Sequence, residues 1–563
     1  MGDRWYEQAV IYCVEVDLFA DSDGDGWGDL AGLTGRLDYL SRLGVDCLWL
    51  NPIHPTPHRD SGYDVADYYG IDPRLGDLGD FAELVQAAGQ RGIRIILDLV
   101  VNHTSNEHPW FRSACADPDS PYRDYYVWSK VEPPDRRQGI VFPGEQTETW
   151  TFDEQAGAWY FHRFYDFQPD LNWSNPAVRE EIRKVMGFWL ALGVAGFRID
   201  AAPFVLETVS PTQPSGQKDF SILDEWRQQV QWRTSDAVLL CEANVDTEDL
   251  PRYTRAAPDG PNDRAHLLFS FLLNPRLWLA LARQEAEPIV ETFSVVPDLG
   301  PHAQWATFLR NHDELDLSRL TETQRQQTFA AFAPRTNMRE FGRGIRRRLA
   351  PMLRGNQRQI RLAYSLQFSM PGTPVLRYGE ELGMGENLAL PGRNAIRTPM
   401  QWDDTRNAGF STAETAQLMA PVVTGGRFGF RTVNVRDQQR DESSLLRWFE
   451  QLIRVLKQTP EIGSGTGSVV DLPVPASVLV HRFDSEEGAV LLIHNLADTT
   501  HTIDLSALNP VPRPRAGSRP ERPWEVFADG PYPPPAPDLS GLELAGFGFR
   551  WIRLHHGRGP ALG

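Results

Sequence analysis

Cysteine is scarce in this chain of 563 residues, and its placement excludes a cysteine-based motif. The four cysteines stand far apart, without any Cys-x-x-Cys spacing. Three of them, Cys13, Cys47 and Cys241, lie inside apolar segments that have the composition of buried strands. Because cysteine in such a segment behaves as a small apolar side chain, we expect buried free thiols there.

The chain also lacks long apolar runs and an excess of basic residues. No stretch of about 18 consecutive apolar residues occurs, and residues 1–8 contain no apolar leader segment. The formal net charge is −19 at pH 7, whereas phosphate-rich partners require a basic surface. We therefore expect a cytoplasmic protein that binds neither nucleic acid nor a membrane.

Aromatic side chains, by contrast, are plentiful. The sequence contains 17 tryptophans, 15 tyrosines and 28 phenylalanines, with 41% hydrophobic and 23% charged residues overall. These apolar and charged fractions are ordinary for a soluble globular protein. The surplus rings would suit the pocket of a neutral ligand, although a large hydrophobic core would explain them equally well.

Apolar strand segments alternate with helical periodicity through most of the chain. Helices are predicted at residues 33–43, 81–90, 178–192 and 221–232. The strand segments number eight, which is the count of a closed (β/α)8 barrel, an α/β TIM-barrel fold that absorbs about 250 to 400 residues. They are residues 9–19, 45–50, 93–101, 196–200, 237–242, 266–271, 305–310 and 374–378.

Two parts of the chain break this alternation. Residues 104–175 are rich in Trp, Tyr, Pro and charge and are too long for a βα loop, so an inserted domain B after the third strand is predicted. From residue 466 the pattern changes to period-2 strands, which predicts a C-terminal antiparallel β-sandwich at 466–563. The barrel would then comprise residues 1–103 and 176–465.

Two further segments are expected to be irregular. A long polar insertion, residues 316–355, separates the seventh strand from its helix. A proline-rich run at residues 509–537 is expected to be a surface loop.

An acidic loop follows the first strand. Carboxylates occupy positions 1, 3, 5 and 9 of a glycine-rich segment that begins at Asp21. Oxygen ligands at this spacing suit Ca2+, with a backbone carbonyl at position 7 and Mg2+ as the alternative ion. Gly32 stands where an EF-hand has its bidentate glutamate, so we expect one isolated structural site or, failing that, a bare acidic turn. The ligands would be Asp21, Asp23, Asp25, Asp29 and the carbonyl of Trp27.

The segment Gly196-Phe197-Arg198-Ile199-Asp200 carries an arginine and an aspartate two residues apart. On a strand, Arg198 and Asp200 would point into one space, while Phe197 and Ile199 face the other way. A carboxylate kept ionised by a neighbouring guanidinium is suited to act as a nucleophile. A structural ion pair is the alternative interpretation of this segment.

Functional side chains of a barrel gather at the C-terminal ends of its strands. Retaining glycosidases use two carboxylates roughly 5 Å apart, and Asp200 and Glu242 end neighbouring predicted strands. The apolar residues before Glu242 predict a raised pKa for its carboxyl, as a general acid requires. A metal centre is the competing interpretation, but arginine and asparagine suit a sugar better. The predicted rim consists of Asp98, Asn102, His103, Arg198, Asp200, Glu242, Asn311, His312 and Asp313.

Four motifs at these strand ends resemble those of the α-amylase superfamily, glycoside hydrolase family 13. They are Asp98-Leu-Val-Val-Asn102-His103, Gly196-Phe-Arg198-Ile-Asp200, Leu240-Cys-Glu242-Ala and Phe308-Leu-Arg-Asn311-His312-Asp313. The resemblance implies that Asp200 is the nucleophile, Glu242 the general acid/base and Asp313 the residue that holds the sugar hydroxyls. It also implies that the chemistry needs no cofactor. In such a site, charge around the glucosyl ring would be stabilised by His103, Arg198 and His312.

The resemblance narrows to the oligo-1,6-glucosidase-like subfamily through Gln168-Pro-Asp-Leu-Asn172 in the insertion. In exo-acting members, a pair matching Asp60 and Arg397 grips the non-reducing 4-hydroxyl, and a bidentate ion pair suits such a dead-end wall. The loop at residues 21–29 matches the Ca2+ loop of these enzymes. Other pocket-lining positions are matched by Tyr63, Phe142, Phe164 and Gln168.

Within this subfamily the chain is most similar to the trehalose synthases, which interconvert maltose and trehalose. The similar segments are residues 344–351, 371–375, 383–387 and 397–402. Arg377 and the segments 390–396 and 207–220 depart from the pattern of these enzymes, and they border the acceptor side of the site.

Three functions are compatible with these residues. The first is an isomerase in which the glucosyl-enzyme on Asp200 is intercepted by the retained glucose. The second is an α-glucosidase or transglucosidase in which water or another acceptor resolves the same intermediate. The third is an inactive sugar-binding relative, which intact Asp200, Glu242 and Asp313 disfavour. The expected partner is a small α-glucoside, and self-association into a homo-oligomer stays open.

Overall fold

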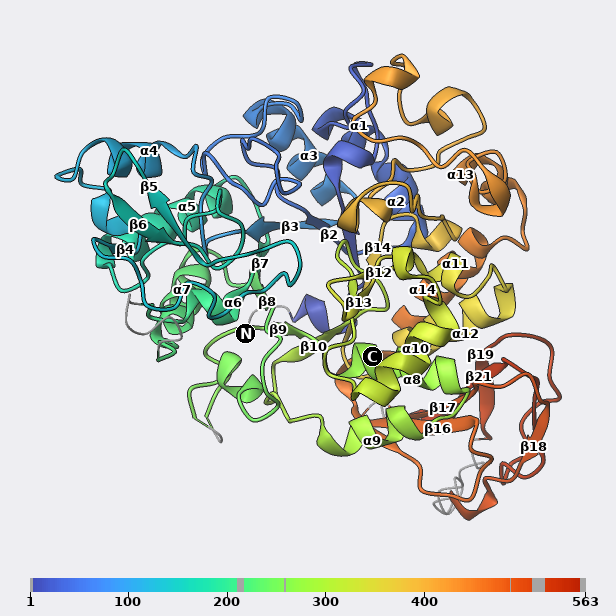
Figure 1. Ribbon diagram of the computed structural model, residues 1–563. Coiled ribbons are helices and arrows are strands. Elements are labelled where there is room, and N and C mark those ends of the chain that lie inside the picture. The colour runs from blue at the N-terminus through green and yellow to red at the C-terminus, as the bar shows by residue number, and fades with distance from the viewer. Residues whose placement is uncertain (1–3, 210–216, 258–259, 487, 509–521, 557–563) are drawn as a thin grey trace.

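A computed structural model describes residues 4–209, 217–257, 260–486, 488–508 and 522–556 of the chain. It contains all eight predicted parallel strands, and they close into a barrel (Figure 1). They are β1 Ile11–Val14, β2 Cys47–Leu50, β3 Arg94–Leu99, β7 Gly196–Ile199, β8 Val238–Cys241, β9 Leu267–Phe269, β10 Gln304–Thr307 and β14 Thr373–Arg377. Their order around the barrel is β1-β14-β10-β9-β8-β7-β3-β2.

The strand β7 divides its side chains between two cores, as its period-2 pattern predicts. Phe197 and Ile199 are buried in the core that lies under the helices. Arg198 pairs in register with Asp98 on β3 and Leu240 on β8, and Leu240 belongs to the core inside the barrel. The register therefore brings Arg198 and Asp98 together inside the barrel.

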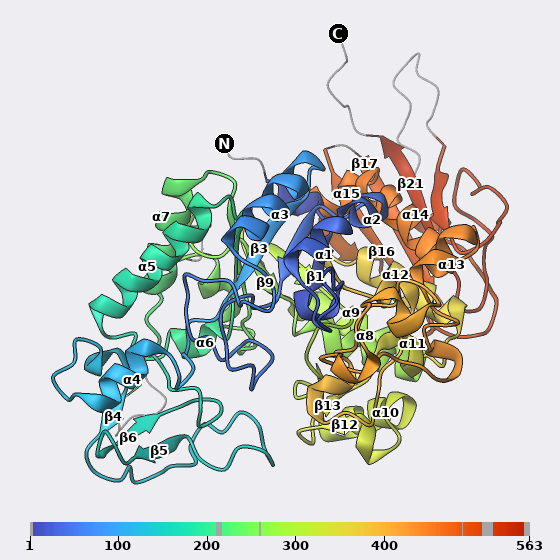
Figure 2. The same ribbon diagram turned by 90° about the horizontal axis from the view of Figure 1, so that it is seen from above.

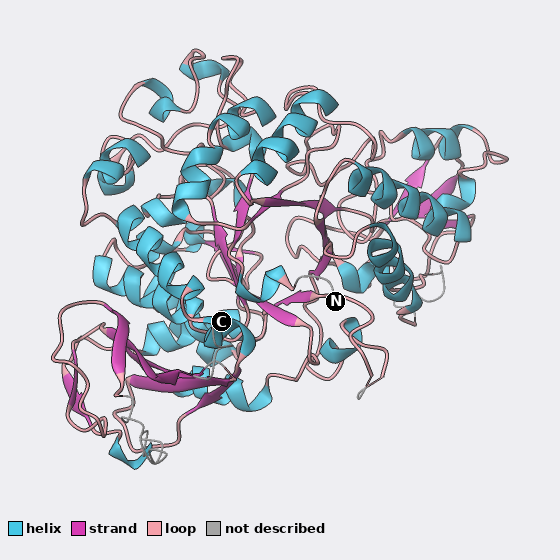
Figure 3. Ribbon diagram, turned by 180° about the vertical axis from the view of Figure 1, so that it is seen from behind, coloured by secondary structure: helices cyan, strands magenta, loops and turns pink. Residues whose placement is uncertain are grey.

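Helices cover the outer face of the barrel (Figure 3). Their starts carry the expected caps: Asp77 forms a capping box with Asp80 before α3, and Asn175 accepts the Ala177 N–H before α5. The long helices are α3 Leu78–Gln90, α5 Pro176–Ala191, α7 Ser221–Arg233, α8 Leu273–Arg283, α12 Gln357–Phe368 and α14 Leu445–Lys457. Shorter ones are α6 Ala202–Val205, α9 Glu287–Val295, α11 Leu349–Met352, α13 Val435–Arg440 and α15 Pro460–Ser464.

The helix predicted at residues 33–43 is instead two helices, α1 (Leu30–Gly35) and α2 (Leu37–Leu43). Arg36 separates them in a non-helical conformation, with φ −106° and ψ 5°. Its guanidinium lies 4.1 Å from the centre of the Trp402 ring. This contact joins residues far apart in the sequence, so the helical periodicity of residues 33–43 cannot predict it.

Two insertions extend from the C-terminal side of the barrel (Figure 2). Between β3 and β7 lie α4 (Pro109–Ala116) and a small sheet of β4 (Trp128–Ser129), β6 (Ala158–Phe161) and β5 (Trp150–Asp153). After β10 lie α10 (Glu322–Phe332) and a sheet of β11 (Leu315–Asp316), β13 (Gly344–Ile345) and β12 (Arg339–Glu340). A bridge between His103 and Asp170 ties the first insertion to the end of β3.

The C-terminal part consists of two packed antiparallel sheets, as predicted. One has the order β15-β16-β17-β21-β19 and the other pairs β18 with β20. Apolar residues from both sheets share a core of their own, whereas Leu492 and Trp551 belong to the main core under the barrel helices. The strands are β15 Thr466–Val469, β16 Val478–Ser485, β17 Gly488–Asn495, β18 His501–Ile503, β19 Trp524–Ala528, β20 Leu542–Leu544 and β21 Phe549–His556.

The expectation of a surface loop at residues 509–537 is wrong in part, because β19 lies inside this run. Residues 509–521 lie outside the described part of the chain. Trp524–Ala528 pairs with β21 at the edge of the large sheet, and Phe527 is buried. An edge strand tolerates nearby prolines, so the strand-forming Trp-Glu-Val-Phe-Ala sequence outweighs them.

Two histidines lie between the C-terminal sheet and α12. The rings of His481 and His494 are stacked with centroids 5.6 Å apart. Nε2 of His481 lies 2.8 Å from the Ser369 carbonyl oxygen, and Nε2 of His494 lies 2.9 Å from Oγ of Ser365. Burial lowers the pKa of His481 to about 4, and burial together with the neighbouring His481 lowers the pKa of His494. Both rings are therefore neutral in the folded protein.

Acid is expected to destabilise the protein through this histidine pair. Between about pH 6.5 and about pH 4, the unfolded chain binds protons on both rings, whereas the folded chain keeps them neutral. The free energy of unfolding therefore falls as pH drops, by up to about 1.4 kcal/mol per pH unit for each histidine. Thermal unfolding of wild type and His494→Gln at about pH 7 and about pH 5 measures this, and the variant should lose less stability. An equal loss in both proteins would contradict the assignment.

The fold bears on two predictions, that of buried free cysteines and that of a chain without a membrane-spanning segment. Cys13, Cys47, Cys115 and Cys241 are all buried and free. Among the described residues, no helix combines the length and the apolar character needed to cross a membrane.

Candidate active site

A cavity of about 470 Å3 opens at the C-terminal ends of the barrel strands. Gln168, Arg198, His312 and Arg397 lie behind its lining and bond to the carboxylates that form it. All the predicted catalytic and sugar-binding side chains therefore gather around one space. Those that line it directly are Asp60, Tyr63, His103, Phe142, Phe164, Asp200, Glu242 and Asp313.

Arg198 joins three carboxylates beneath this cavity. Its Nη1 lies 2.6 Å from Asp98 Oδ1 and 2.5 Å from Asp200 Oδ1, and its Nη2 lies 2.9 Å from Glu242 Oε2. The Arg198 side chain is only 1% exposed. One guanidinium therefore holds Asp200 and Glu242 side by side at the ends of neighbouring strands.

Burial raises the pKa of both carboxyls that Arg198 bridges at the cavity. Burial raises the pKa of Asp200 to about 6, against the lowering effect of Arg198. Burial likewise raises the pKa of Glu242, which is the direction predicted from the apolar residues before it. Arg198 does not hold the pKa of Asp200 below its ordinary value, because burial is the larger effect. At neutral pH Asp200 is mainly ionised.

The residue after Asp200 has a strained backbone that orients Glu242. Ala201 is left-handed, with φ 48° and ψ 37°, a conformation that is costly for a residue with a Cβ. Its N–H donates to Glu242 Oε2 at 3.1 Å, and the Ala202 N–H donates to the Glu242 carbonyl at 3.2 Å. The turn after β7 thus fixes both the backbone and the carboxyl of Glu242.

Asp313 lies between two arginines and a histidine. Its Oδ2 lies 3.1 Å from His312 Nε2, and its Oδ1 accepts from Arg393 Nη1 at 2.9 Å and Arg397 Nη2 at 3.0 Å. Although burial opposes ionisation, His312 and Arg393 hold the pKa of Asp313 well below its usual range. Asp313 is therefore a permanent anion opposite the other two carboxyls.

Tyr63 and His103 lie next to these charged groups. The hydroxyl of Tyr63 donates to Asp98 Oδ2 at 3.0 Å and lies 2.8 Å from His312 Nε2. His103 Nε2 lies 3.0 Å from the Tyr63 carbonyl oxygen, and its ring packs edge-on against Phe164 at 5.2 Å. Burial lowers the pKa of His103 to about 4, so this ring is neutral.

The wall predicted from Asp60 and Arg397 is built differently. Asp60 Oδ1 accepts from Arg393 Nη2 at 2.9 Å, and its Oδ2 accepts from Gln168 Nε2 at 3.0 Å. Arg397 instead bonds Asp313 and the His312 carbonyl, the latter at 2.9 Å. The predicted Asp60–Arg397 pair is therefore wrong, and Arg393 is the guanidinium in contact with Asp60.

Arg393 was missed because sequence gives no sign of which arginine after β14 turns toward Asp60. It stands four residues before Arg397, on the short 3-10 helix Gly392–Ala395. The cavity is also lined by polar residues that were not among the predicted catalytic and sugar-binding residues. They are Glu207, Lys218, Asn244, Glu314, Asp316, Ser318 and Arg343.

The acidic loop gathers three of its predicted ligands. One carboxylate oxygen each from Asp21, Asp23 and Asp29 lies within 4.8 Å of the others. Asp25 lies outside this group, and its Oδ1 accepts the Trp27 N–H at 2.7 Å. The donor set is all oxygen, which fits a hard cation such as Ca2+, but with fewer carboxylates than the loop supplies.

The structure combines a closed (β/α)8 barrel with an aromatic-lined cavity that contains two arginine-bridged carboxyls and a third carboxylate. This combination defines a class, the enzymes that transfer glycosyl groups. The family description "Alpha amylase, catalytic domain" matches residues 13–338 and 345–465. The chain belongs to this α-amylase family, glycoside hydrolase family 13.

The relatives of the chain agree with this membership. It is 41% identical over 562 residues to trehalose synthase/amylase TreS of Mycolicibacterium smegmatis, covering 98% of this chain and 93% of that protein. It is 38% identical over 563 residues to trehalose synthase of Pimelobacter sp., covering 98% and 96%. Among solved structures, a trehalulose synthase MutB has a TM-score of 0.76 at 27% identity, covering 98% of this chain and 100% of that one.

Proposed function

We propose that the protein interconverts maltose and trehalose through a glucosyl-enzyme on Asp200. The observation that carries this proposal is the shared bonding of Asp200 and Glu242 to one arginine, Arg198. This arrangement supports a double displacement at one anomeric carbon. Identity of about 40% to trehalose synthases over nearly the whole chain supports the choice of substrates.

In the first step, an Asp200 carboxylate oxygen forms a bond to C1 of the glucosyl ring. The bond from C1 to the bridging oxygen breaks, and Glu242 gives its proton to that oxygen. The released glucose stays in the cavity and turns. In the second step, its anomeric hydroxyl attacks C1, its proton passes to Glu242, and Asp200 leaves as a carboxylate. The products differ from the substrate only in linkage.

The other residues bind the glucosyl ring. Asp313, an anion, holds ring hydroxyls as charge develops at C1. His103, Arg198 and His312 stabilise the changing charges around the ring. Tyr63, Phe142 and Phe164 form its apolar and aromatic surroundings. At the far end, Asp60 stands with Gln168 and Arg393 at the non-reducing 4-hydroxyl.

Hydrolysis or transfer to another acceptor is the second candidate, because the same intermediate serves both. The lining of the cavity also includes the polar side chains of Glu207, Asn244 and Asp316. Water held there could resolve the glucosyl-enzyme unless the retained glucose excludes it.

Incubation of the protein with maltose, trehalose and sucrose in separate reactions tests the proposal. We expect trehalose from maltose and maltose from trehalose, with little free glucose, because the retained glucose is the acceptor. Product separation by anion-exchange chromatography measures the ratio. Rapid release of glucose from maltose without trehalose would replace the isomerase with the hydrolase.

We further propose one bound Ca2+ at the loop of residues 21–29, with Mg2+ as the alternative. Asp21, Asp23 and Asp29 would hold it, because their oxygens already converge. Gly26 in this loop has φ 101°, and a Cβ there would lie 2.3 Å from the Gln417 carbonyl oxygen. The loop therefore also anchors the chain near residue 417.

Metal analysis of the purified protein is expected to find about one tightly held Ca2+ per chain. Asp21→Ala should abolish the bound ion and lower the melting temperature, whereas Asp25→Asn, outside the converging group, should retain it. Retention by both variants would place the ion elsewhere, and an absence of metal in wild type would reduce the loop to an acidic turn.

A further inference from the structure

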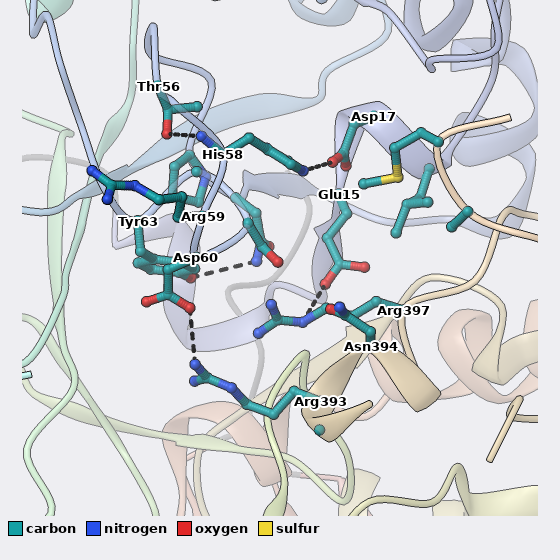
Figure 4. A pocket seen from close by; sticks show the side chains of 18 of the residues that line it. Glu15, Asp17, Thr56, His58, Arg59, Asp60, Tyr63, Arg393, Asn394 and Arg397 are labelled. Atoms are coloured by element: carbon teal, nitrogen blue, oxygen red, sulfur yellow. Dashed lines mark hydrogen bonds and ion pairs between the residues drawn. The ribbon is translucent and has the colours of Figure 1, made fainter. Parts of the chain in front are cut away.

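Four charges of alternating sign form a row that leads from strand β14 to the catalytic cavity. Arg377 Nη2 donates to Glu15 Oε2 at 2.8 Å, and Glu15 Oε1 lies 3.7 Å from Arg397 Nε. Figure 4 shows the Glu15 carboxylate facing the Arg397 guanidinium. Arg397 Nη2 donates in turn to Asp313 Oδ1 at 3.0 Å. Of the four residues only Asp313 lines the catalytic cavity, so Arg377 reaches the sugar site through other charged side chains.

The strand pattern places Arg377 and Glu15 inside the barrel. Arg377 ends β14, two residues after Val375, which belongs to the core inside the barrel. Cys13 on β1 belongs to the same core and pairs in register with Arg377. Glu15 follows Cys13 by two residues and is still extended, with φ −90° and ψ 108°. Because side chains two apart on an extended chain share a face, both charged side chains point into the barrel.

The burial of this ion pair is costly. The side chains of Arg377 and Glu15 are only 1% and 8% exposed. Although burial raises the pKa of Glu15, Arg377 and Arg397 together lower it below its ordinary value, so Glu15 is an anion. A buried ion pair rarely stabilises a protein more than apolar side chains of the same size would. A role in the site therefore explains the pair better than a contribution to stability.

Arg397 has two anions within reach, Asp313 and Glu15. It already donates to Asp313, and its Nε donates to the His312 carbonyl at 2.9 Å. Glu15 Oε1 accepts no hydrogen bond from any described residue, so it could accept one from Arg397 after a small movement. Without the charge of Arg377, Arg397 would be the remaining ion-pair partner of Glu15 within the described part of the chain. A buried anion left with one partner attracts that partner strongly.

We propose that Arg377 is a positioning residue for the reaction: by pairing with Glu15 it keeps Arg397 on Asp313 and so holds Asp313 in place for the sugar hydroxyls. The proposal rests on the proposed function, in which Asp313 holds ring hydroxyls as charge develops at C1. Arg377 lies outside the lining of the cavity, so its effect on the reaction passes through Glu15 and Arg397.

The rate of glucosyl-enzyme formation tests this role. Release of p-nitrophenol from p-nitrophenyl α-glucoside measures it whichever acceptor follows. Arg377→Met should lower kcat about tenfold and change KM less than about twofold, because the contacts of Asp313 strengthen mainly in the transition state. Arg377→Lys, which keeps the positive charge, should lose less than about threefold. Arg377→Gln can still donate to Glu15, and it should show the same kind of loss if the methionine variant does not fold.

A second substitution separates positioning from loss of stability. Adding Glu15→Gln to Arg377→Met should return kcat to within about threefold of wild type, because Arg397 then has no competing anion. Arg553 and Glu461 form a control ion pair, 2.6 Å apart and 9% and 1% exposed, at the C-terminal sheet. Arg553→Met should lower the melting temperature and leave kcat unchanged. A double variant as slow as Arg377→Met, or an equal loss of kcat in Arg553→Met, would overturn the proposal.

A crystal structure of Arg377→Met gives a readout that does not depend on activity. Arg397 should be bonded to Glu15 and no longer to Asp313, and an Arg397 that stays on Asp313 would refute the positioning role. An unchanged kcat in Arg377→Met would also sink this role alone. Wild type that releases no p-nitrophenol and leaves maltose unchanged would instead sink the proposed function, so the two failures are distinguishable.

Discussion

Replacement of Asp200 by alanine is expected to lower kcat on maltose by about 10,000-fold. In the proposed reaction this mutation removes the group that forms the bond to C1, and no other carboxylate is placed to replace it. Asp98 binds the same Arg198 nitrogen as Asp200, but its side chain is fully buried, while Asp313 is occupied by His312, Arg393 and Arg397. Initial rates with maltose and with trehalose measure the loss, which should be the same for both because they share one intermediate.

A matched control comes from Glu207, a carboxylate of the same cavity that pairs with Arg163 at 2.8 Å instead of with Arg198. Glu207→Gln should cost less than about 100-fold, since this residue borders the acceptor side. Azide added to Asp200→Ala should restore cleavage of an activated glucoside by attacking C1 from the vacated side, giving a β-glucosyl azide. Near-normal activity of Asp200→Ala without azide would refute the role of Asp200.

The acid side of the rate profile follows from the same residue. The pKa of Asp200 is about 6, raised by burial, and the nucleophile must be ionised. The value of kcat/KM is therefore expected to fall as pH drops below about 6, because protonated Asp200 cannot attack C1. A plot of log(kcat/KM) against pH that stays flat down to about pH 4.5 would contradict this assignment.

The strand-end residues of the site were predictable because they depend on local periodicity. Arg198 and Asp200 share a face through the two-residue repeat of β7, and Glu242 ends the adjacent strand β8. The parallel barrel then brings these strand ends to one rim, independently of the conformation of the loops. Residues placed by strand register need no knowledge of the distant chain, and the sequence was sufficient for them.

The loop residues of the site depend on contacts that sequence does not encode locally. Arg393 and Arg397 are equally plausible partners of Asp60 in the sequence, and the turn Gly392–Ala395 decides between them. Asp25 has the right spacing for a cation ligand, but its carboxylate lies outside the group formed by Asp21, Asp23 and Asp29. In both cases the spacing of residues in a loop does not fix where their side chains point.

Glu314 is a second candidate for the general acid, so the role of Glu242 needs a separate test. Glu314 also lines the catalytic cavity, and burial raises its pKa to about 7, which would suit a general acid. Glu242, however, shares Arg198 with Asp200 and is oriented by the Ala201 N–H. A proton donor must act on the oxygen attached to the carbon that Asp200 attacks, so geometry favours Glu242 over Glu314.

Glu242→Gln is accordingly expected to lower kcat on maltose by about 1,000-fold or more, because the amide cannot protonate the bridging oxygen. With α-glucosyl fluoride, the rate of glucosyl-enzyme formation should decrease far less in this variant, because fluoride leaves without needing a proton. Pre-steady-state fluoride release should therefore stay fast in Glu242→Gln, whereas Glu314→Gln should retain most of its activity on both substrates. A large and equal loss on both substrates in Glu242→Gln would mean a structural role.

The pH dependence separates the two carboxyls further. Wild type should lose kcat/KM for maltose as pH rises through the raised pKa of Glu242, since the acid must be protonated in the free enzyme. With α-glucosyl fluoride this alkaline limb should be absent from the glucosylation step, while the acid limb near pH 6 from Asp200 remains. If Glu314 were the acid, Glu314→Gln would remove the alkaline limb for maltose and Glu242→Gln would keep it. The opposite result is expected, because Arg198 bonds both Asp200 and Glu242, and Glu314 is not part of this bridge.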